Sequence, residues 1–465
     1  MKLQMSREVD LGKEPVGKLL VILALPAITS QVVNALYNMV DRMYIGHIEG
    51  IGADALTGVG VCFPIIMIIS AFAYLLGMGG APRASIYMGK KKNDHAEKIL
   101  GNCFTALTIV AIALTVLVLL FREPLLYLFG ASERTIGYAI EYIDIYAIGT
   151  IFVQLTLGMN AFISAQGFST ISMLTVIIGA LTNIILDPIF IFVFHMNVSG
   201  AAWATILSQA LSALWAVRFL MGEQTILRLK KENLKIQWKV LAPCIALGVA
   251  PFAMQATESV LVLCFNSSLL SYGGDLAVGA MTILSSIMQF AMLPMQGLTQ
   301  GGQPIISYNY GASNPQRVKK AFQLQTIACF TYSTVMWLAI MLVPSLFIAI
   351  FTNDPQLTQI SVWALRIYMA GVLLMGLQVS CQQTFIAFGN SKISAFLAVF
   401  RKIIVLIPLI YILPQFFSDQ VFAVFLAESI ADTIAVLTTL TLFIINFKKL
   451  LKHMESEEPD SEAIR

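Results

Sequence analysis

Carboxylic acids stand inside long apolar stretches of the 465-residue sequence, where charged side chains are rare. Those of the first half are Asp41, Glu141, Asp144 and Asp187, and the only base among them is Arg42. An ionised carboxylate that has been removed from water is unstable unless it pairs with a base, binds a cation or holds a proton. The first half therefore keeps an excess of about three carboxylates. Such an excess predicts a site for a coupling ion.

Polar residues in helices near Asp187 are expected to complete this site. Asn183 lies four residues before Asp187, so both side chains share one helix face. Asp187 and Thr205 lie at similar distances from the loop between them, and Asn160 and Asn183 lie at similar distances from the preceding loop. Each pair is therefore expected to lie at similar depth in the membrane. Together with Asp41 they offer carboxylate, amide and hydroxyl oxygens that suit Na⁺, while a buried carboxylate can carry H⁺ instead. Helix–helix hydrogen bonding is the alternative role for the amides and the hydroxyl.

The second half carries acids and bases in equal number. They are Glu258, Glu428 and Asp432 against Arg366, Arg401 and Lys402. We expect this half to neutralise itself by pairing. Glu258 lies in the middle of an apolar stretch with Gln255 on roughly the same side, which indicates either a proton site or a counter-ion for a cationic substrate. A salt bridge to one of the three bases is the alternative.

Methionines fall on one face of the stretch at 276–308, among them Met288 and Met292. Methionine side chains are flexible and suit an adaptable, promiscuous pocket. Packing in the apolar core is the alternative. The six cysteines form no CxxC pair and the four histidines are scattered, so we expect no His/Cys metal site and no resident cofactor.

The composition indicates what kind of protein positions these residues. Hydrophobic residues make up 58% of the chain and charged residues 12%, and the mean hydropathy is +0.80. Soluble domains carry roughly 25% charged residues, so the low value excludes a cytosolic enzyme and a nucleic-acid binder. A membrane-spanning helix needs about 20 apolar residues. We predict an all-α membrane protein with twelve spans at about 17–45, 54–88, 97–121, 135–165, 169–195, 200–222, 239–270, 276–308, 318–351, 355–387, 391–414 and 418–447.

An internal repeat divides the chain into two six-span units. Residues match at a constant offset of 222, and the matched pairs include Gly89 and Gly311, Gly149 and Gly371, and Gly167 and Gly389. Six spans return the chain to its starting side, so the units are parallel and related by a pseudo-two-fold axis along the membrane normal. We predict an N-terminal bundle at 1–222, a basic cytoplasmic linker at 223–238, a C-terminal bundle at 239–447 and a disordered cytoplasmic tail at 448–465.

The distribution of basic residues predicts the orientation. Lysine and arginine gather in the loops after the second and sixth spans and near the C-terminus. The positive-inside rule then places both termini in the cytoplasm. Pro26 and Pro251 lie inside the first span of each half, where a proline can bend a helix, so we expect them to act as hinges.

Three segments resemble the MATE family of multidrug and toxin extrusion transporters, in particular the bacterial branch near the DinF and MepA types. They are Leu36-Tyr37-Asn38-Met39-Val40-Asp41-Arg42, the stretch from Thr182 to Phe192 that holds Asn183 and Asp187, and the stretch from Gly301 to Gly311. The resemblance covers essentially the whole chain and includes its split into six plus six spans.

This resemblance implies a cation-coupled antiporter that exports organic cations and other amphipathic compounds. It implies alternating access between two bundles, a location in the bacterial inner membrane, and contact with small molecules and lipid but no nucleic acid. We expect a monomer. The family's N-bundle ion site corresponds residue by residue to Asp41, Asn160, Asn183, Asp187 and Thr205, all intact here. In the NorM-type branch a second acid pair lies in spans 7 and 10. Glu258 matches the first member, but span 10 carries Arg366 in place of an acid.

Each alternative function predicts different sequence features. A flippase for lipid-linked oligosaccharides, from a related exporter family, is the nearest alternative, and it normally has a strongly basic cavity for pyrophosphate. A membrane enzyme needs a catalytic constellation that the scattered histidines do not supply. A channel needs a pore ring, which a two-fold repeat does not obviously make. The coupling ion, H⁺ or Na⁺, is left open.

Overall fold

The computed structural model describes residues 9–456, and within that range every regular element is helical. In a membrane only helices and closed barrels satisfy the backbone hydrogen bonds of a spanning segment, so the long apolar stretches fold as helices. The first half contains α1 (Val16–Gly46), α2 (Gly52–Gly89), α3 (Asn93–Leu128), α4 (Ile136–Ile148), α5 (Thr150–Ala165), α6 (Ser169–Pro188), the π-helical turn η1 (Ile189–Val193) and α7 (Asn197–Met221).

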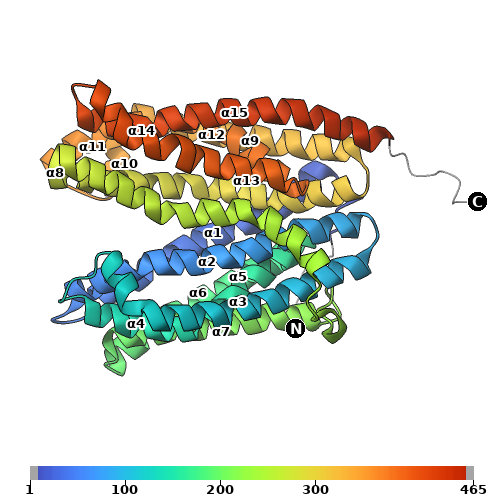
Figure 1. Cartoon of the computed structure of the whole chain (residues 1–465), viewed down its shortest axis with the longest axis horizontal. Helices are drawn as coiled ribbons and strands as arrows, with labels where there is room; N and C mark the ends of the chain where they lie inside the picture. Colours follow the sequence, from blue (N-terminus) through green and yellow to red (C-terminus); the bar gives the residue numbers. More distant parts are fainter. Residues whose placement is uncertain (1–8, 457–465) are drawn as a thin grey trace, which may run out of the picture.

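The second half follows a short connection that holds the 3₁₀ turn η2 (Lys231–Asn233). Its elements are α8 (Trp238–Gly311), α9 (Pro315–Leu342), α10 (Pro344–Ile348), α11 (Pro355–Tyr368), α12 (Val372–Ala387), α13 (Ser391–Val399), the π-helical η3 (Phe400–Leu406), α14 (Ile407–Ile412), the 3₁₀ turn η4 (Leu413–Phe416) and α15 (Gln420–Ser456). Figure 1 shows the two halves as two groups of helices that lie side by side. We call them the N-bundle and the C-bundle.

The α8 helix makes two spans. Straight, its 74 residues would reach roughly 110 Å, several times the thickness of a bilayer. The backbone leaves helical geometry at Gly274, where φ is +62° and ψ is −162°, and there the chain turns back (Figure 1). With α8 counted twice, the nine apolar helices and two bent helix pairs found in residues 9–456 confirm the twelve predicted spans.

The fourth span of each half is broken at matching glycines. The axes of α4 and α5 differ by 56° around Gly149, and those of α11 and α12 differ by 46° beside Gly371. A β-carbon at Gly149 would lie 2.0 Å from Ile206 Cδ1, and one at Gly371 would lie 2.7 Å from Asp432 Cβ. Both breaks therefore let a neighbouring helix approach closely, which only glycine permits. The internal repeat is thus a repeat of structure as well as of sequence.

The two bundles meet most closely at the end of the molecule where α1 begins and α15 ends, which we call the terminal end. A β-carbon at Gly89 would lie 2.0 Å from Tyr308 O, and one at Gly311 would lie 2.0 Å from Ile86 O. Further along, a β-carbon at Gly301 would lie 2.4 Å from Ala24 Cα. Backbones in such contact leave no space between the bundles there.

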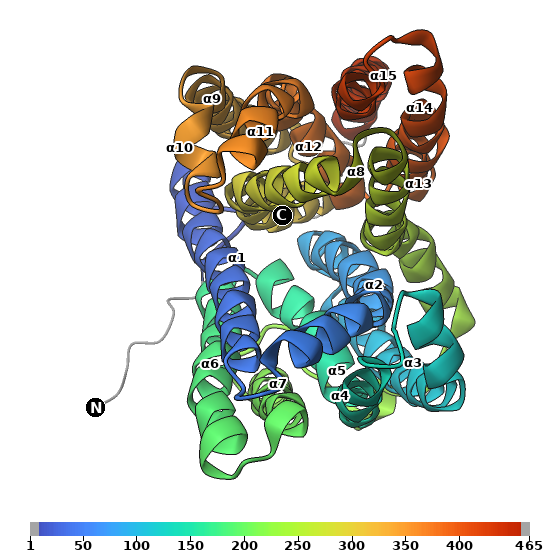
Figure 2. The same ribbon diagram turned by 90° about the vertical axis from the view of Figure 1, so that its left-hand side faces the viewer.

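The first helix of each half leans on the other half at the terminal end. Leu19 and Leu23 of α1 share a buried cluster with Ile305 and Ile306 of α8. The start of α8 is in turn buried with α2 and α3 of the N-bundle, through Leu241 among others. In Figure 2, which looks along the helices, α1 crosses from the upper group of helices to the lower group. The predicted linker at 223–238 therefore separates the two halves along the chain. In the folded protein, however, the first helix of each half also packs against the other half.

The predicted linker is bound to the N-bundle. Gln166 Oε1 accepts hydrogen bonds from Leu227 N (2.7 Å) and Thr225 Oγ1 (2.8 Å). Lys230 Nζ lies 2.6 Å from Glu97 Oε2. The hydrogen bond and the charge of Glu97 raise the pKa of Lys230 above its usual value. The linker is therefore held as part of the terminal end.

The α15 helix continues past the predicted end of its span. Residues 448–456, which we expected to belong to a disordered tail, are helical. They remain ordered because Leu450, Leu451 and Met454 pack into the cluster that surrounds the start of α1. The rest of the predicted tail, residues 457–465, lies outside the described residues.

Candidate functional site

Asp41 and Asp187 bring two carboxyl groups together inside the N-bundle. Asp41 lies near the end of α1, and Asp187 lies in the last turn of α6, just before η1. The Asp187 side chain is completely buried, and the two carboxyl groups are close enough to share a hydrogen bond. Like charges at this separation repel, so a cation or a proton between them would be strongly favoured.

Asn183 and Thr205 join this pair, as their spacing predicted. Asn183 Nδ2 donates to Asp187 Oδ1 at 3.2 Å and to Thr205 Oγ1 at 3.4 Å. Three buried oxygens of the group have no hydrogen-bond partner, namely Asp41 Oδ1, Asp187 Oδ2 and Asn183 Oδ1. Unsatisfied buried acceptors are costly in a protein interior. This group of four residues, which we call the N-bundle site, therefore has the acceptors that a small cation or a proton would satisfy.

Asn160 has a different neighbour. Its Nδ2 donates to Ser172 O at 3.3 Å, which ties α5 to α6. Its Oδ1 is buried and has no hydrogen-bond partner. The helix–helix role is therefore visible in the structure, and participation in the N-bundle site stays a prediction.

Tyrosines surround the N-bundle site, and the sequence analysis missed them. Tyr142 lies beside Thr205, and Tyr146 stacks beside Tyr142 with ring centroids 6.1 Å apart. Tyr37 lies one helical turn before Asp41 and beside Gln209. Only Tyr37 had a usable signal, because its spacing of four places it on the same face of α1 as Asp41.

The remaining charges of the first half do not belong to this site. Asp144 pairs with Arg122 across α3 and α4, and Glu141 is exposed. Arg42 lies over the ring of Phe63 at 5.0 Å. The predicted excess of about three buried carboxylates was therefore too high, because a base at the end of α3 lies within reach of Asp144. The excess that remains is Asp41 and Asp187.

In the C-bundle, Glu258 forms a salt bridge with Lys402. Lys402 Nζ also donates to Met254 O at 2.8 Å. The Glu258 side chain is 56% exposed, whereas that of Lys402 is 7% exposed. The paired alternative is therefore the one that the structure contains. Gln255, which we expected beside Glu258, instead contacts Met67 of α2, with Nε2 2.8 Å from Sδ.

Arg401 holds the other two acids of the C-bundle. It lies 2.8 Å from Glu428 Oε1 and 2.6 Å from Asp432 Oδ1, and all three side chains are largely buried. Arg366 is elsewhere, because its Nε donates to Met341 O in an exposed position. Arg366 therefore pairs with none of these acids, although we expected it to share in the pairing of the second half. The buried acids Glu428 and Asp432 are matched by the buried bases Arg401 and Lys402, and Glu258 is more than half exposed.

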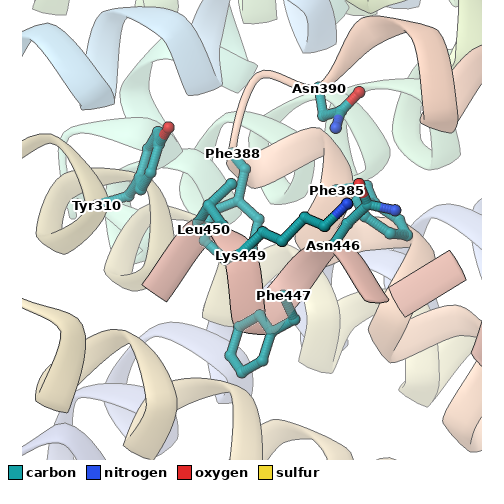
Figure 3. Close-up of a pocket in the computed structure, with 8 residues that line it drawn as sticks. All are labelled: Tyr310, Phe385, Phe388, Asn390, Asn446, Phe447, Lys449 and Leu450. Atoms are coloured by element: carbon teal, nitrogen blue, oxygen red, sulfur yellow. The ribbon is translucent and has the colours of Figure 1, made fainter. Parts of the chain in front are cut away.

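A cavity of about 50 Å³ lies against these charges. Met254, Met292 and Met375 line it together with Arg401 and Lys402. Met292 thus lines this cavity, and its part in an adaptable pocket stays a prediction, while Met288 packs against the apolar core of the C-bundle. A larger pocket of about 300 Å³ is shown in Figure 3. Aromatic residues at the terminal ends of α8, α12 and α15 line it, so it is separate from both charged groups.

The two predicted hinges remain helical. α1 is continuous across Pro26 and α8 is continuous across Pro251. Each proline lacks an amide hydrogen and removes one backbone hydrogen bond from its helix. That weak point is present in both helices, and bending there stays a prediction.

Comparisons with known proteins identify the family to which this chain belongs. The MatE family model matches residues 26–189 and 251–412, which together are well over half of the chain. The chain is 24% identical to the "Multidrug export protein MepA" of Staphylococcus haemolyticus, covering 90% of this chain and 92% of that protein. It is 25% identical to the protein of the same name from Staphylococcus aureus, covering 91% and 94% respectively.

Solved structures have the same architecture. One described as "MATE in the bent conformation" superposes with a TM-score of 0.90 and 22% identity, covering 97% of this chain and all of that one. An outward-facing multidrug resistance MATE transporter gives a TM-score of 0.89 and 22% identity, covering 96% and 99%. Since the family model also spans both halves of the repeat, this chain belongs to the MatE family of membrane transporters.

Proposed function

We propose that the protein is a cation-coupled antiporter that exports amphipathic organic cations from the cell. The family membership and the export proteins among its relatives support transport as the activity. The observation that supports coupling of export to a cation is the N-bundle site, where the carboxyl groups of Asp41 and Asp187 lie together and have oxygens without hydrogen-bond partners. H⁺ or Na⁺ would neutralise the pair, and no resident cofactor is needed. Because one chain contains both bundles, we propose that it works as a monomer.

The geometry fits a state that is closed at the terminal end. The bundles touch from Gly89 and Gly311 at that end to mid-depth, where Gln31 Nε2 donates to Gln300 Oε1 at 3.0 Å. The basic loops lie at the terminal end, so we propose that this end faces the cytoplasm. The coupling ion would then enter from outside, since Asp41 and Asp187 lie toward the opposite end of α1 and α6.

The α1 helix is the element through which ion binding would act. It packs on α6 of the N-bundle and on α8 of the C-bundle. Neutralising Asp41 changes the interaction of α1 with α6, and a bend near Pro26 would change its contact with α8. Exchange requires that ion and substrate favour different states. A helix that contacts both bundles meets that requirement.

The experiment is efflux of ethidium, an organic cation, from proteoliposomes with the pH gradient and the Na⁺ gradient imposed separately. We expect one gradient to drive transport, Asp187→Asn to abolish it, and the exposed matched control Glu141→Gln to preserve it. Gradient-driven efflux by Asp187→Asn at the normal rate would refute the proposed site. The flippase alternative has no structural support, because the N-bundle site has an excess of acids and the buried acids and bases of the C-bundle are equal in number, so neither group offers a basic surface to a pyrophosphate.

A further inference from the structure

The pocket of about 300 Å³ at the terminal end has a preformed aromatic wall (Figure 3). Its volume is at the lower limit of known small-molecule sites. Phe385, Phe388 and Phe447 line it together with Tyr310. The rings support one another, with centroids 5.1 Å apart for Tyr310 and Phe388 and 6.0 Å apart for Phe388 and Phe447. The wall is therefore held in place by packing and presents an apolar surface to a ligand.

The polar part of this pocket offers hydrogen-bond donors and a positive charge. Asn390 Oδ1 accepts from Ile393 N at 3.2 Å, which leaves the amide nitrogen to donate to a ligand. Asn446 Nδ2 uses one hydrogen on Leu442 O at 2.8 Å and retains the other. Lys449 is exposed and extends toward Asn446 in Figure 3. Among the described residues that line the pocket, none is an acid. The pocket therefore suits an anionic group that carries an apolar body.

The exposed face of α15 shows how deep in the membrane the pocket lies. Ile444 and Ile445 are 57% and 49% exposed, as expected for side chains that contact lipid tails. Within the next two turns the exposed residues are Lys448, Lys449 and Lys452. This change from apolar to basic marks the level of the lipid head groups. The α15 residues that line the pocket lie between 446 and 450, which is at that level.

We propose that this pocket binds the head group of an anionic phospholipid from the membrane leaflet at the terminal end. The phosphate accepts hydrogen bonds from Lys449, Asn446 and Asn390, and the glycerol and upper acyl carbons cover the aromatic wall. The acyl chains continue into the bilayer beside Ile445, which lies four residues before Lys449 on α15. Basic pockets between transmembrane helices at this depth are suited to such head groups. A soluble phosphate leaves the aromatic wall uncovered, and the lysines repel an organic cation. The inference goes beyond the proposed function and does not depend on it.

A lipid bound in this pocket also stabilises the closed terminal end. Phe388 belongs to the buried cluster that contains Leu19 and Leu23 of α1, and Phe447 and Leu450 pack against that cluster. The pocket and the packing surface of α1 therefore share side chains. Filling the pocket restricts those side chains, so lipid binding favours the state in which the start of α1 lies against the C-bundle.

The first test is a lipid titration of the purified full-length chain in detergent, with bound molecules counted by native mass spectrometry. The ligands are phosphatidylglycerol, phosphatidylcholine, which has no net charge, and glycerol 3-phosphate, which is soluble. We expect one site that prefers phosphatidylglycerol to both others. Lys449→Gln should weaken this site about fivefold, the effect of one lysine on an anionic head group. Asn446→Leu should weaken it as well. The matched control Lys448→Gln, an exposed neighbour that does not line the pocket, should leave it unchanged.

Three results of this titration would overturn the proposal. Equal weakening by Lys448→Gln and Lys449→Gln would indicate a diffuse basic surface in place of a site. Equally tight binding of phosphatidylcholine or glycerol 3-phosphate would identify a different ligand. Binding of phosphatidylglycerol only after deletion of residues 457–465 would make that acidic segment the occupant of the pocket.

The second test is hydrogen exchange of residues 16–23 at the start of α1. Saturating phosphatidylglycerol should slow this exchange in the unmodified chain, and it should have little effect in Lys449→Gln at the same lipid concentration. Unchanged exchange in the unmodified chain would refute the link between the pocket and the closed terminal end. Neither test uses a gradient or transport, so failure of the proposed function in the efflux experiment would leave both results unaffected.

Discussion

Gly89 and Gly311 hold reciprocal positions across the axis that relates the two halves. A β-carbon on either would lie 2.0 Å from a carbonyl oxygen of the other half, that of Tyr308 for Gly89 and that of Ile86 for Gly311. These contacts obey the sequence offset, since Ile86 and Tyr308 are also 222 residues apart. The terminal end is therefore closed by a two-fold contact between backbones.

Replacing Gly89 by alanine should open this contact. The added methyl group collides with a backbone carbonyl, so the closed state should be destabilised by about 1–3 kcal/mol relative to the open one. Labelling of a cysteine introduced at the terminal end should become faster. The matched control is Gly60→Ala on the same helix, where a β-carbon meets no atom within 4 Å. Equal labelling of the two variants would argue against the contact as a closure.

Arg317 fastens the segment before α1 to the C-bundle. Its guanidinium donates to Leu11 O at 3.0 Å, to Glu14 O at 2.7 Å and to Asn309 Oδ1 at 2.9 Å. Arg317→Ala should weaken the closed terminal end by about 1–3 kcal/mol, the range for losing charged hydrogen bonds. Hydrogen exchange of residues 9–15 should accelerate, whereas the exposed control Lys319→Ala should leave it unchanged. Unaltered exchange in Arg317→Ala would rule out this role.

Asp41 and Asp187 should act as one unit. Either Asp41→Asn or Asp187→Asn removes the like-charge pair, so each single variant should lose the ion-dependent rise in melting temperature. The double variant should lose no more than the single ones, because residues of one network are not additive. Thermal unfolding at several Na⁺ concentrations and pH values measures this. Effects that simply add would mean that the two carboxylates titrate independently.

The linker should loosen at high pH. Because Glu97 raises the pKa of Lys230, the bond between them stabilises the folded linker fully below the ordinary lysine pKa of about 10.4 and loses that effect as pH rises through the raised value. Lys230→Met should mimic this loss at neutral pH. A spin label at Glu232 should report greater mobility in that variant. Lys231→Met is the neighbouring control, and a label equally mobile in both would contradict the role of the pair.

Much of the fold could be predicted from sequence because membrane spans must be long, apolar and helical. The contacts of Asn183 with Asp187 and Thr205 agree with the sequence, since residues that flank one short loop lie at similar depth. The sequence did not indicate which acids Arg366, Arg401 and Lys402 contact. Which side of a helix faces which neighbour depends on packing, and the π-helical η3 alters that direction in a way that α-helical spacing does not describe.

Breaks and closures were harder to predict. The repeat identified Gly149 and Gly371 as matched positions. It did not predict that the helix bends at each of them, because the bend follows from the approach of Ile206 or Asp432. The helical end of α15 was missed for a similar reason. Its lysines indicate exposure, and only the structure shows that Leu450 and Met454 have an apolar surface to cover.

α1 packs against the C-bundle, and the start of α8 packs against the N-bundle. This crossing of the first helices has a consequence for biosynthesis. The ribosome delivers the first half before α8 exists, so the groove of the N-bundle that receives Leu241 and Cys244 stays unfilled until the second half emerges. The start of α1 likewise lacks its packing partners until α8 and α9 have been synthesised. Neither half can complete its own terminal end, so the two halves must mature together as one folding unit.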